Sequence, residues 1–297
     1  ALENNISVKQ SELDLENAKL NKMDAIGNLL PTLNGNASYT TNTGASINPT
    51  TNQFENETFS SFTTGASSSL TLFDGLRNIR QLQRAKLSRL ASQYQLEKME
   101  SDIALAVANS YLQVLLNKAN LEAIKSQNEV SQEQLERTQN LVDAGTLPQG
   151  DLLEIKATIA NEIQQIVVAE NNIQISLISL AQLLLIEDYE TFQIVDEGYE
   201  VISTEIADLA PQEIIRNAQS SRPEVKIAEK NVELAEKDVE IARGSYYPTL
   251  SAFFNYNTRY SDNDFLNGNF TDQLWQNDGL GYGFQLNVPI FNGLSVR

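Results

Sequence analysis

Cysteine and histidine are both absent from the 297 residues of the sequence. The first absence excludes disulfides, thiolate nucleophiles and zinc–thiolate sites, and the second removes the commonest general base and metal ligand. Most familiar hydrolase and metalloenzyme mechanisms are therefore excluded. No Gly-x-Ser-x-Gly or Ser-x-x-Lys element occurs in a suitable strand-to-helix setting. The sequence thus predicts a protein that is not an enzyme and that uses no metal or cofactor.

Basic residues and long apolar runs are also scarce. The 21 Lys and Arg residues are outnumbered by 39 Asp and Glu residues, and the formal charge is -18. This charge argues against nucleic acid as a partner, because phosphates require a basic surface. A transmembrane helix requires a run of about 18 to 20 apolar residues, and no stretch of the sequence approaches that length. The most apolar helical run, 173–186, is interrupted by Gln174, Ser176, Ser179 and Gln182. No signal peptide is visible at the start, which predicts a chain that is cytosolic, already processed or trimmed.

Proline and glycine are missing from the long stretch 76–142. At 1.5 Å per residue, a continuous helix over this stretch would be about 100 Å long. Its second half predicts a coiled-coil seam, because the residues that recur at heptad spacing are Val107, Ser110, Val114, Asn117, Leu121, Ile124, Asn128, Ser131, Leu135, Thr138 and Val142. The small and polar members favour helices packed side by side in a wall. Residues 151–185 predict a second amphipathic helix of about 50 Å, antiparallel to the first.

The break between these helices, 143–151, has the chemistry of a tight turn. Gly145 supplies the left-handed conformation that ends a helix, and Pro148 prevents continuation. Asp151 followed by Glu154 predicts an N-cap with a reciprocal carboxylate three residues later. Capping alone therefore accounts for Asp151.

An internal repeat relates residues 1–33 to residues 218–250, which align without a gap. Both copies end a helix with Pro-Thr-Leu, at Pro31 and at Pro248. In the second copy a heptad seam of small residues is expected, formed by Val225, Ala228, Val232, Ala235, Val239 and Ala242.

After each Pro-Thr-Leu the hydrophobic period changes to two, which indicates strands of about ten residues. In the second copy the apolar face consists of Leu250, Ala252, Phe254, Tyr256, Thr258 and Tyr260, followed by Leu280, Tyr282, Phe284, Leu286, Val288 and Ile290. The first copy is weaker, with Leu33, Gly35, Ala37 and Tyr39, then Phe62, Thr64, Ala66, Ser68, Leu70 and Leu72. The opposite faces are polar apart from Phe253. Such strands suit a barrel with lipid outside and water inside, and the core of a soluble sandwich is the alternative.

Matching turns follow the returning strands, Phe73-Asp-Gly-Leu and Phe291-Asn-Gly-Leu, and Asp74 and Asn292 are expected to cap helices. The segments 42–61 and 261–278 are polar and predict exposed loops. The whole pattern predicts a mostly α protein with β, in which a long antiparallel coiled-coil hairpin accompanies two β-hairpins. Its expected parts are a helix at 1–30, a β-hairpin at 31–73, a helical hairpin at 74–185, a connector at 186–210, a helix at 211–247, a second β-hairpin at 248–291 and the start of a helix at 292–297.

The chain resembles the TolC-like outer-membrane factors in four features taken together. These are the two Pro-Thr-Leu elements, the Phe-(Asp/Asn)-Gly-Leu turns, Ser221-Arg-Pro-Glu-Val and the 144–152 tip. The resemblance covers essentially the whole chain, which departs from the family in lacking a second helical hairpin. It implies a homotrimer whose subunits share a 12-stranded barrel in outer-membrane lipid of a Gram-negative bacterium and an α-barrel in the periplasm. It also implies a passive exit duct for efflux or type I secretion of drugs, metabolites or proteins, fed by an inner-membrane transporter through a periplasmic adaptor.

The resemblance places Gly145, Thr146, Leu147 and Asp151 where such channels meet adaptor tips. Leu147 favours contact, because an apolar side chain at an exposed tip has no core to enter. Asp143, Asp151 and Glu154 would lie at the channel entrance, either as a threefold acidic ring or as solvated helix ends. The residues expected to face the membrane are Leu250, Phe254, Tyr256, Tyr260, Leu280, Tyr282, Phe284 and Leu286.

Two other classes of protein have a similar helical pattern. A periplasmic adaptor also carries a long helical hairpin, but it would not repeat helix-to-strand units with lipid-compatible alternation. A soluble coiled-coil scaffold would explain the heptads and leave the strands at 250–260 and 280–290 without a purpose.

Overall fold

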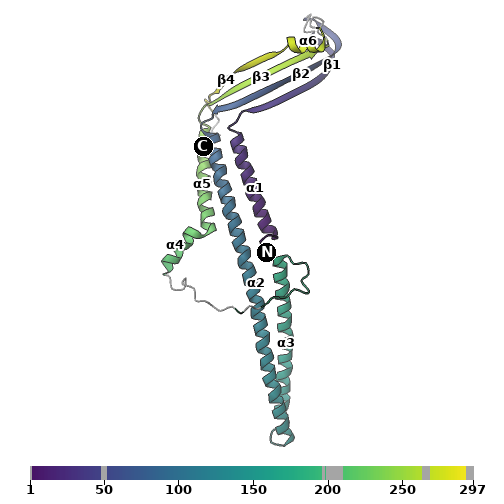
Figure 1. Ribbon diagram of the computed structural model, residues 1–297, viewed down its shortest axis with the longest axis vertical. Coiled ribbons are helices and arrows are strands. Elements are labelled where there is room, and N and C mark those ends of the chain that lie inside the picture. Colours follow the sequence, from purple (N-terminus) through teal and green to yellow (C-terminus); the bar gives the residue numbers. More distant parts are fainter. Residues whose placement is uncertain (1, 48–51, 196–197, 199–209, 263–267, 292–297) are drawn as a thin grey trace. The chain divides into compact units, whose positions relative to one another are not determined.

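The computed structural model describes residues 2–47, 52–195, 198, 210–262 and 268–291 (Figure 1). It is mostly helical with one four-stranded antiparallel sheet, which confirms the predicted fold class at that level. Its elements are α1 (Ile6–Gly27), β1 (Thr32–Ile47), β2 (Phe54–Phe73), α2 (Arg77–Asp143), α3 (Gln149–Leu184), α4 (Pro211–Ser221), α5 (Pro223–Gly244), β3 (Thr249–Ser261), α6 (Phe270–Gln276) and β4 (Gly279–Asn287).

The chain divides into two compact units. The first comprises residues 1–14 and 93–226, and therefore holds most of α2 together with α3 and α4. The second comprises residues 15–92 and 227–297, and holds the sheet, α6 and the helix segments next to the sheet.

The core of the first unit lies where α3 packs on α2. Val114, Leu177 and Leu180 are buried there, and Phe192 and Ile194 pack against them from the segment after α3. Two hydrogen bonds fix this segment on α2. The Tyr111 hydroxyl donates to the carbonyl of Val195 at 2.7 Å, and the Lys118 ammonium donates to the carbonyl of Ile194 at 3.2 Å. The first part of the expected connector, 186–195, is thus a strap over the helix pair; 196–197 and 199–209 lie outside the described residues.

Further along the pair, α2 and α3 are joined through a buried carboxylate. Glu162 on α3 is 8% exposed. It accepts hydrogen bonds from the Asn128 amide at 3.0 Å and the Ser131 hydroxyl at 2.8 Å. Both donors belong to the predicted seam of α2. Because a buried carboxylate is stable only when its oxygens are paired, this cluster fixes one register between the helices.

Among the described residues, α3 is long and apolar enough to cross a membrane by length and composition. The sequence has no uninterrupted apolar run of that length, and on this criterion no membrane-spanning helix is expected. The difference arises because scattered polar residues, among them Ser176, interrupt the apolar run of α3 but are too few to make its mean hydropathy low. Ser176 and Leu180 are buried in the helix pair, so at this point the polar and apolar residues of α3 serve packing.

The single helix expected at 211–247 is two helices. Arg222 has φ -69° and ψ 128°, an extended conformation, and it ends α4 directly before Pro223. Proline disfavours the helical conformation of the residue before it and has no N–H to donate, so the helix breaks here. The expected seam of α5 is also not packed in the described chain, since Val232 and Val239 are exposed. Of the aligned positions in α1, Val8, Ala18 and Ala25 are buried, while Leu15 and Lys22, which align with Val232 and Val239, are half-buried.

The strands of the second unit form a meander in the order β1-β2-β3-β4, so that β1 and β4 are the edges of the described sheet. β1 and β2 have 16 and 20 residues, which is longer than the expected ten. Most of the loop expected at 42–61 is therefore paired, for example Thr43 with Thr58. Threonine and asparagine in this segment suggested a loop, but threonine is a good strand residue whose hydroxyls pair across the strands.

The elbow between β2 and α2 is tightly packed. Asp74 is buried and its carboxylate accepts the backbone N–H of Asn78 at 2.9 Å, as expected of a capping side chain, although α2 begins at Arg77, two residues later than an N-cap at Asp74 implies. Asn292, the equivalent residue in the second copy, lies outside the described residues. Gly75 has φ +72°, and a Cβ at this position would overlap the carbonyl oxygen of Gly244 at the end of α5. The elbow thus needs glycine twice over, for its backbone conformation and for space.

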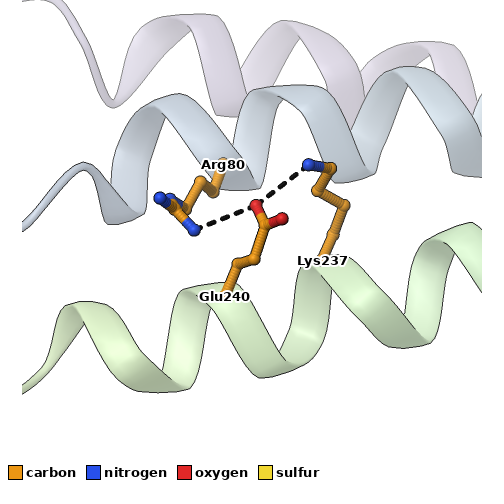
Figure 2. Close-up of polar contacts among 3 residues, drawn as sticks. All are labelled: Arg80, Lys237 and Glu240. Carbon is orange, nitrogen blue, oxygen red and sulfur yellow. Dashed lines mark hydrogen bonds and ion pairs between the residues drawn. The ribbon is translucent and has the colours of Figure 1, made fainter.

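Ion pairs join α2 to α5 next to the elbow. Figure 2 shows Glu240 of α5 between Arg80 of α2 and Lys237 of α5. Its carboxylate lies 2.9 Å from a nitrogen of each. The Lys237 hydrogen bond and the nearby arginines lower the pKa of Glu240. Arg84 and Asp238 make a second pair at 2.5 Å. These ion pairs are partly exposed, so they contribute little to the stability of the fold and mainly align the two helices.

Replacement of the buried carboxylate tests the first unit. Glu162→Ala removes the acceptor of two buried donors, and we expect the helical unfolding transition to lose about 1–3 kcal/mol. Glu170→Ala is the matched control, because Glu170 lies on the same helix in an exposed pair with Lys125. It should cost no more than about 1 kcal/mol. Urea unfolding followed by circular dichroism measures both, and equal losses would contradict the role of Glu162.

Substitution of the elbow glycine tests the second unit. Gly75→Ala should destabilise the protein by more than about 1 kcal/mol, since alanine is disfavoured at positive φ and its methyl group has no space. A Cβ at Gly150 meets nothing within 4 Å, so Gly150→Ala in the first turn of α3 should be neutral or slightly stabilising. Thermal unfolding distinguishes the two, and a neutral Gly75→Ala would show that the elbow is not constrained.

Candidate functional site: the helical tip and the two faces of the sheet

The tip between α2 and α3 is a hydrogen-bonded turn around Gly145. This residue has φ +79°, as expected for the left-handed position. Its N–H donates to the carbonyl of Val142, and the N–H of Thr146 donates to the carbonyl of Leu141, both at 2.9 Å. These bonds form a Schellman motif. The Thr146 hydroxyl also donates to Leu141 at 2.8 Å, so Thr146 holds the turn, a role that the sequence analysis did not predict.

The predicted N-cap at Asp151 is wrong. The helix α3 begins at Gln149, with extended Pro148 in the cap position, and within the described chain no side chain caps it. Proline carries no N–H to satisfy and its φ of -74° leads directly into a helix, so the helix begins two residues earlier than expected. Asp151 is exposed in the first turn, where its carboxylate complements the positive end of the helix dipole.

The other residues singled out at the tip differ in exposure. Leu147 is half-buried, with its N–H 3.3 Å from the carbonyl of Leu141, so it is less open than expected. Asp143 and Glu154 are exposed, and Asp143 accepts a hydrogen bond from Gln139 at 2.9 Å. In the part of the chain that the structure describes, no group of three or more acidic residues is arranged to hold a metal ion.

The register of the sheet collects the alternating apolar residues on one face. Tyr39 pairs with Phe62 and Phe62 with Tyr260, while Phe254 pairs with Ser68 and Tyr282. Members of this apolar face on the four strands are Leu33, Ala37, Tyr39, Phe62, Ala66, Leu70, Leu250, Phe254, Tyr256, Tyr260, Leu280, Tyr282, Phe284 and Leu286. None carries a charge. Tyr282 and Phe284 are 78% and 73% exposed, so much of this face has no cover in the described chain.

The opposite face is polar. Across one row Asn34 pairs with Ser67, Ser67 with Asn255, and Asn255 with Gly281. Two aromatic residues interrupt it, Phe59 on β2 and Phe253 on β3, and the Phe253 ring lies over Gly283, where a Cβ would be 3.2 Å from the ring. The sheet thus has the apolar face on one side and a hydrophilic face on the other, with only backbone between them.

Helix α6 was not predicted. It lies in the segment expected as a loop and contacts β3. The signal for it was Asn269 as N-cap residue, Asp272 in the first turn and Phe270 four residues before Leu274. Polar residues on both sides concealed this short amphipathic turn.

The sequence profile of the family described as outer membrane efflux protein matches residues 1–184. The chain belongs to this family. Members of the family are located in the outer membrane of Gram-negative bacteria and extend into the periplasm, which is the location predicted for this chain. They are efflux channels and not enzymes. No curated protein matches the chain individually.

Solved structures agree with this membership. The chain is similar to CusC (TM-score 0.81, 18% identity, 98% of this chain and 64% of that chain). It is also similar to the outer membrane protein VceC of Vibrio cholerae (TM-score 0.82, 17% identity, 99% and 68%) and to a membrane protein of Pseudomonas aeruginosa (TM-score 0.80, 20% identity, 98% and 65%). At these identities the likeness shows the fold. The chain spans about two thirds of the length of these proteins.

Proposed function

We propose that this efflux-family protein is the outer-membrane duct of a tripartite assembly. Three copies would close one barrel of 12 strands in the lipid and extend their helices into the periplasm. A periplasmic adaptor and an inner-membrane transporter would deliver drugs, metabolites or proteins to it. The cargo would pass through this duct passively.

The sheet register carries this proposal. An uncharged apolar face across all four strands, backed by a face that is mostly Asn, Ser, Thr and Gly, suits lipid on one side and water on the other. The alternative, a sandwich core, needs a second layer over the apolar face. The described chain provides only α6, at one end, and leaves Tyr282 and Phe284 open.

Two further observations support association. β1 and β4 are edges of the described sheet, and a bilayer has no water to satisfy unpaired strand edges. The heptad face of α5 with Val232 and Val239 is exposed, whereas most of the aligned face of α1 is buried. An exposed seam with helical spacing calls for another helix beside it.

The tip suits the adaptor contact. Gly145 and Thr146 hold a compact turn, and Leu147 presents a partly exposed apolar side chain next to the charges of Asp143 and Asp151. An acidic ring at the entrance, formed by Asp143, Asp151 and Glu154 of three subunits, would favour cations. Deletion of the full-length gene, followed by a toxic-compound panel and an assay of secreted proteins, distinguishes efflux from secretion.

Arginine placed on either side of one strand tests the barrel. Phe284→Arg puts a charge on the apolar face and should cost about 2–4 kcal/mol in a bilayer. We expect a marked loss of folded protein from the outer-membrane fraction. Gln285→Arg, on the polar face of the same strand, should assemble normally. Equal assembly of both variants would contradict lipid contact at the apolar face.

A charge at the tip tests the adaptor contact. Leu147→Asp should leave the amount of outer-membrane trimer unchanged and reduce cross-linking to the adaptor and resistance to toxic compounds together. Gln149→Asp introduces the same charge two residues away, in the first helical turn, and should retain most of both. If Leu147→Asp keeps full resistance and cross-linking, Leu147 serves only the turn.

A further inference from the structure

The end of the sheet opposite the helices carries an aromatic cluster. β3 and β4 are joined there through α6, while α5 enters at the other end of β3 (Figure 1). The Phe270 ring of α6 lies 5.6 Å from Phe62 and 5.0 Å from Tyr260. Both partners belong to the apolar face. α6 therefore lies on the oily side of the sheet and not over its polar side, where a loop that closed the barrel mouth would lie.

Helix α6 is clamped in this position by Gln273, which is 2% exposed. Its side-chain amide accepts the N–H of Ser261 at 2.9 Å and donates to the Ser261 carbonyl at 3.0 Å, as a further strand would. The Thr258 hydroxyl donates to the carbonyl of Leu274 at 2.6 Å, and the Asn277 amide donates to the carbonyl of Arg259 at 3.1 Å. These bonds give α6 a fixed place on β3.

These hydrogen bonds fix the backbone of α6, and α6 carries Trp275, the only tryptophan of the sequence. Trp275 is 78% exposed, although such a large ring is normally buried at least in part. Tyr39, on the same face and at the same end, is also exposed. Tryptophan and tyrosine have an apolar ring and a polar N–H or O–H, which suits the boundary between headgroups and acyl chains.

We propose that α6 is a membrane-interface anchor in which Trp275 sits at the headgroup boundary of the outer leaflet. This inference rests on the proposed barrel, because only a barrel turns the apolar face toward lipid. The partner is the lipid surface. The indole ring of Trp275, held rigidly at one end of the sheet, sets the depth at which the barrel lies in the bilayer.

Quenching of tryptophan fluorescence by brominated lipids tests the anchor. The full-length protein, with any other tryptophan replaced by phenylalanine, is reconstituted in phosphatidylcholine vesicles whose acyl chains carry bromine near the headgroup or near the chain end. We expect Trp275 emission to be lost with shallow bromine and largely kept with deep bromine. Emission that neither lipid quenches would overturn the anchor, whether the ring faces water or another subunit.

Two matched variants separate this inference from the barrel itself. In a Trp275→Phe background, Tyr282→Trp reports the middle of the apolar face and should be quenched by deep bromine. Phe253→Trp, on the polar face, should not be quenched. Quenching at position 282 without quenching of Trp275 overturns only the anchor, whereas no quenching at position 282 overturns the barrel and the anchor together.

Discussion

The constraint on which the structure depends is the pairing of backbone groups in a sheet that has one oily face. In hydrocarbon no water is present to bond a free N–H or C=O, so a sheet that enters a bilayer must have no open edge. The described sheet satisfies its interior strands β2 and β3 but ends at β1 and β4. The proposed closure by neighbouring copies meets this requirement, and the polar face then surrounds the duct.

The helices meet a related constraint by different means. A 67-residue helix about 100 Å long cannot bury its surface in one core, so α2 is packed along its length by different partners. Near the sheet these are glycine contacts and ion pairs with α5, and along α3 they are a small apolar cluster and the buried Glu162. Buried polar groups fix alignment where apolar contacts alone would permit sliding. A wall of helices, as the proposed duct requires, would need this register more than a large core.

Periodicity predicted the sequence of helices and strands well, because amphipathic spacing reports directly which face is covered. That Tyr39, Phe62 and Tyr260 share one face of the sheet follows from alternation, whereas the register that pairs them is known only from the structure. The errors arose where one residue competes with a pattern. Pro148 and Pro223 decided where helices begin, against the capping signal of Asp151 and the heptads of α5. Glu162 and Gln273 were not found, since no sequence pattern shows which polar side chain will be enclosed by a distant element.

The central claim is that water lies on one face of the sheet and lipid on the other. The absence of cysteine in this sequence permits a direct measurement. Single cysteines at Phe254 and Asn255, neighbours on β3 with opposite faces, are introduced into a cysteine-free full-length protein and treated in intact outer membranes with a small water-soluble maleimide. We expect rapid labelling at position 255 and none at position 254. Equal labelling, or labelling at 254 alone, would contradict the claim.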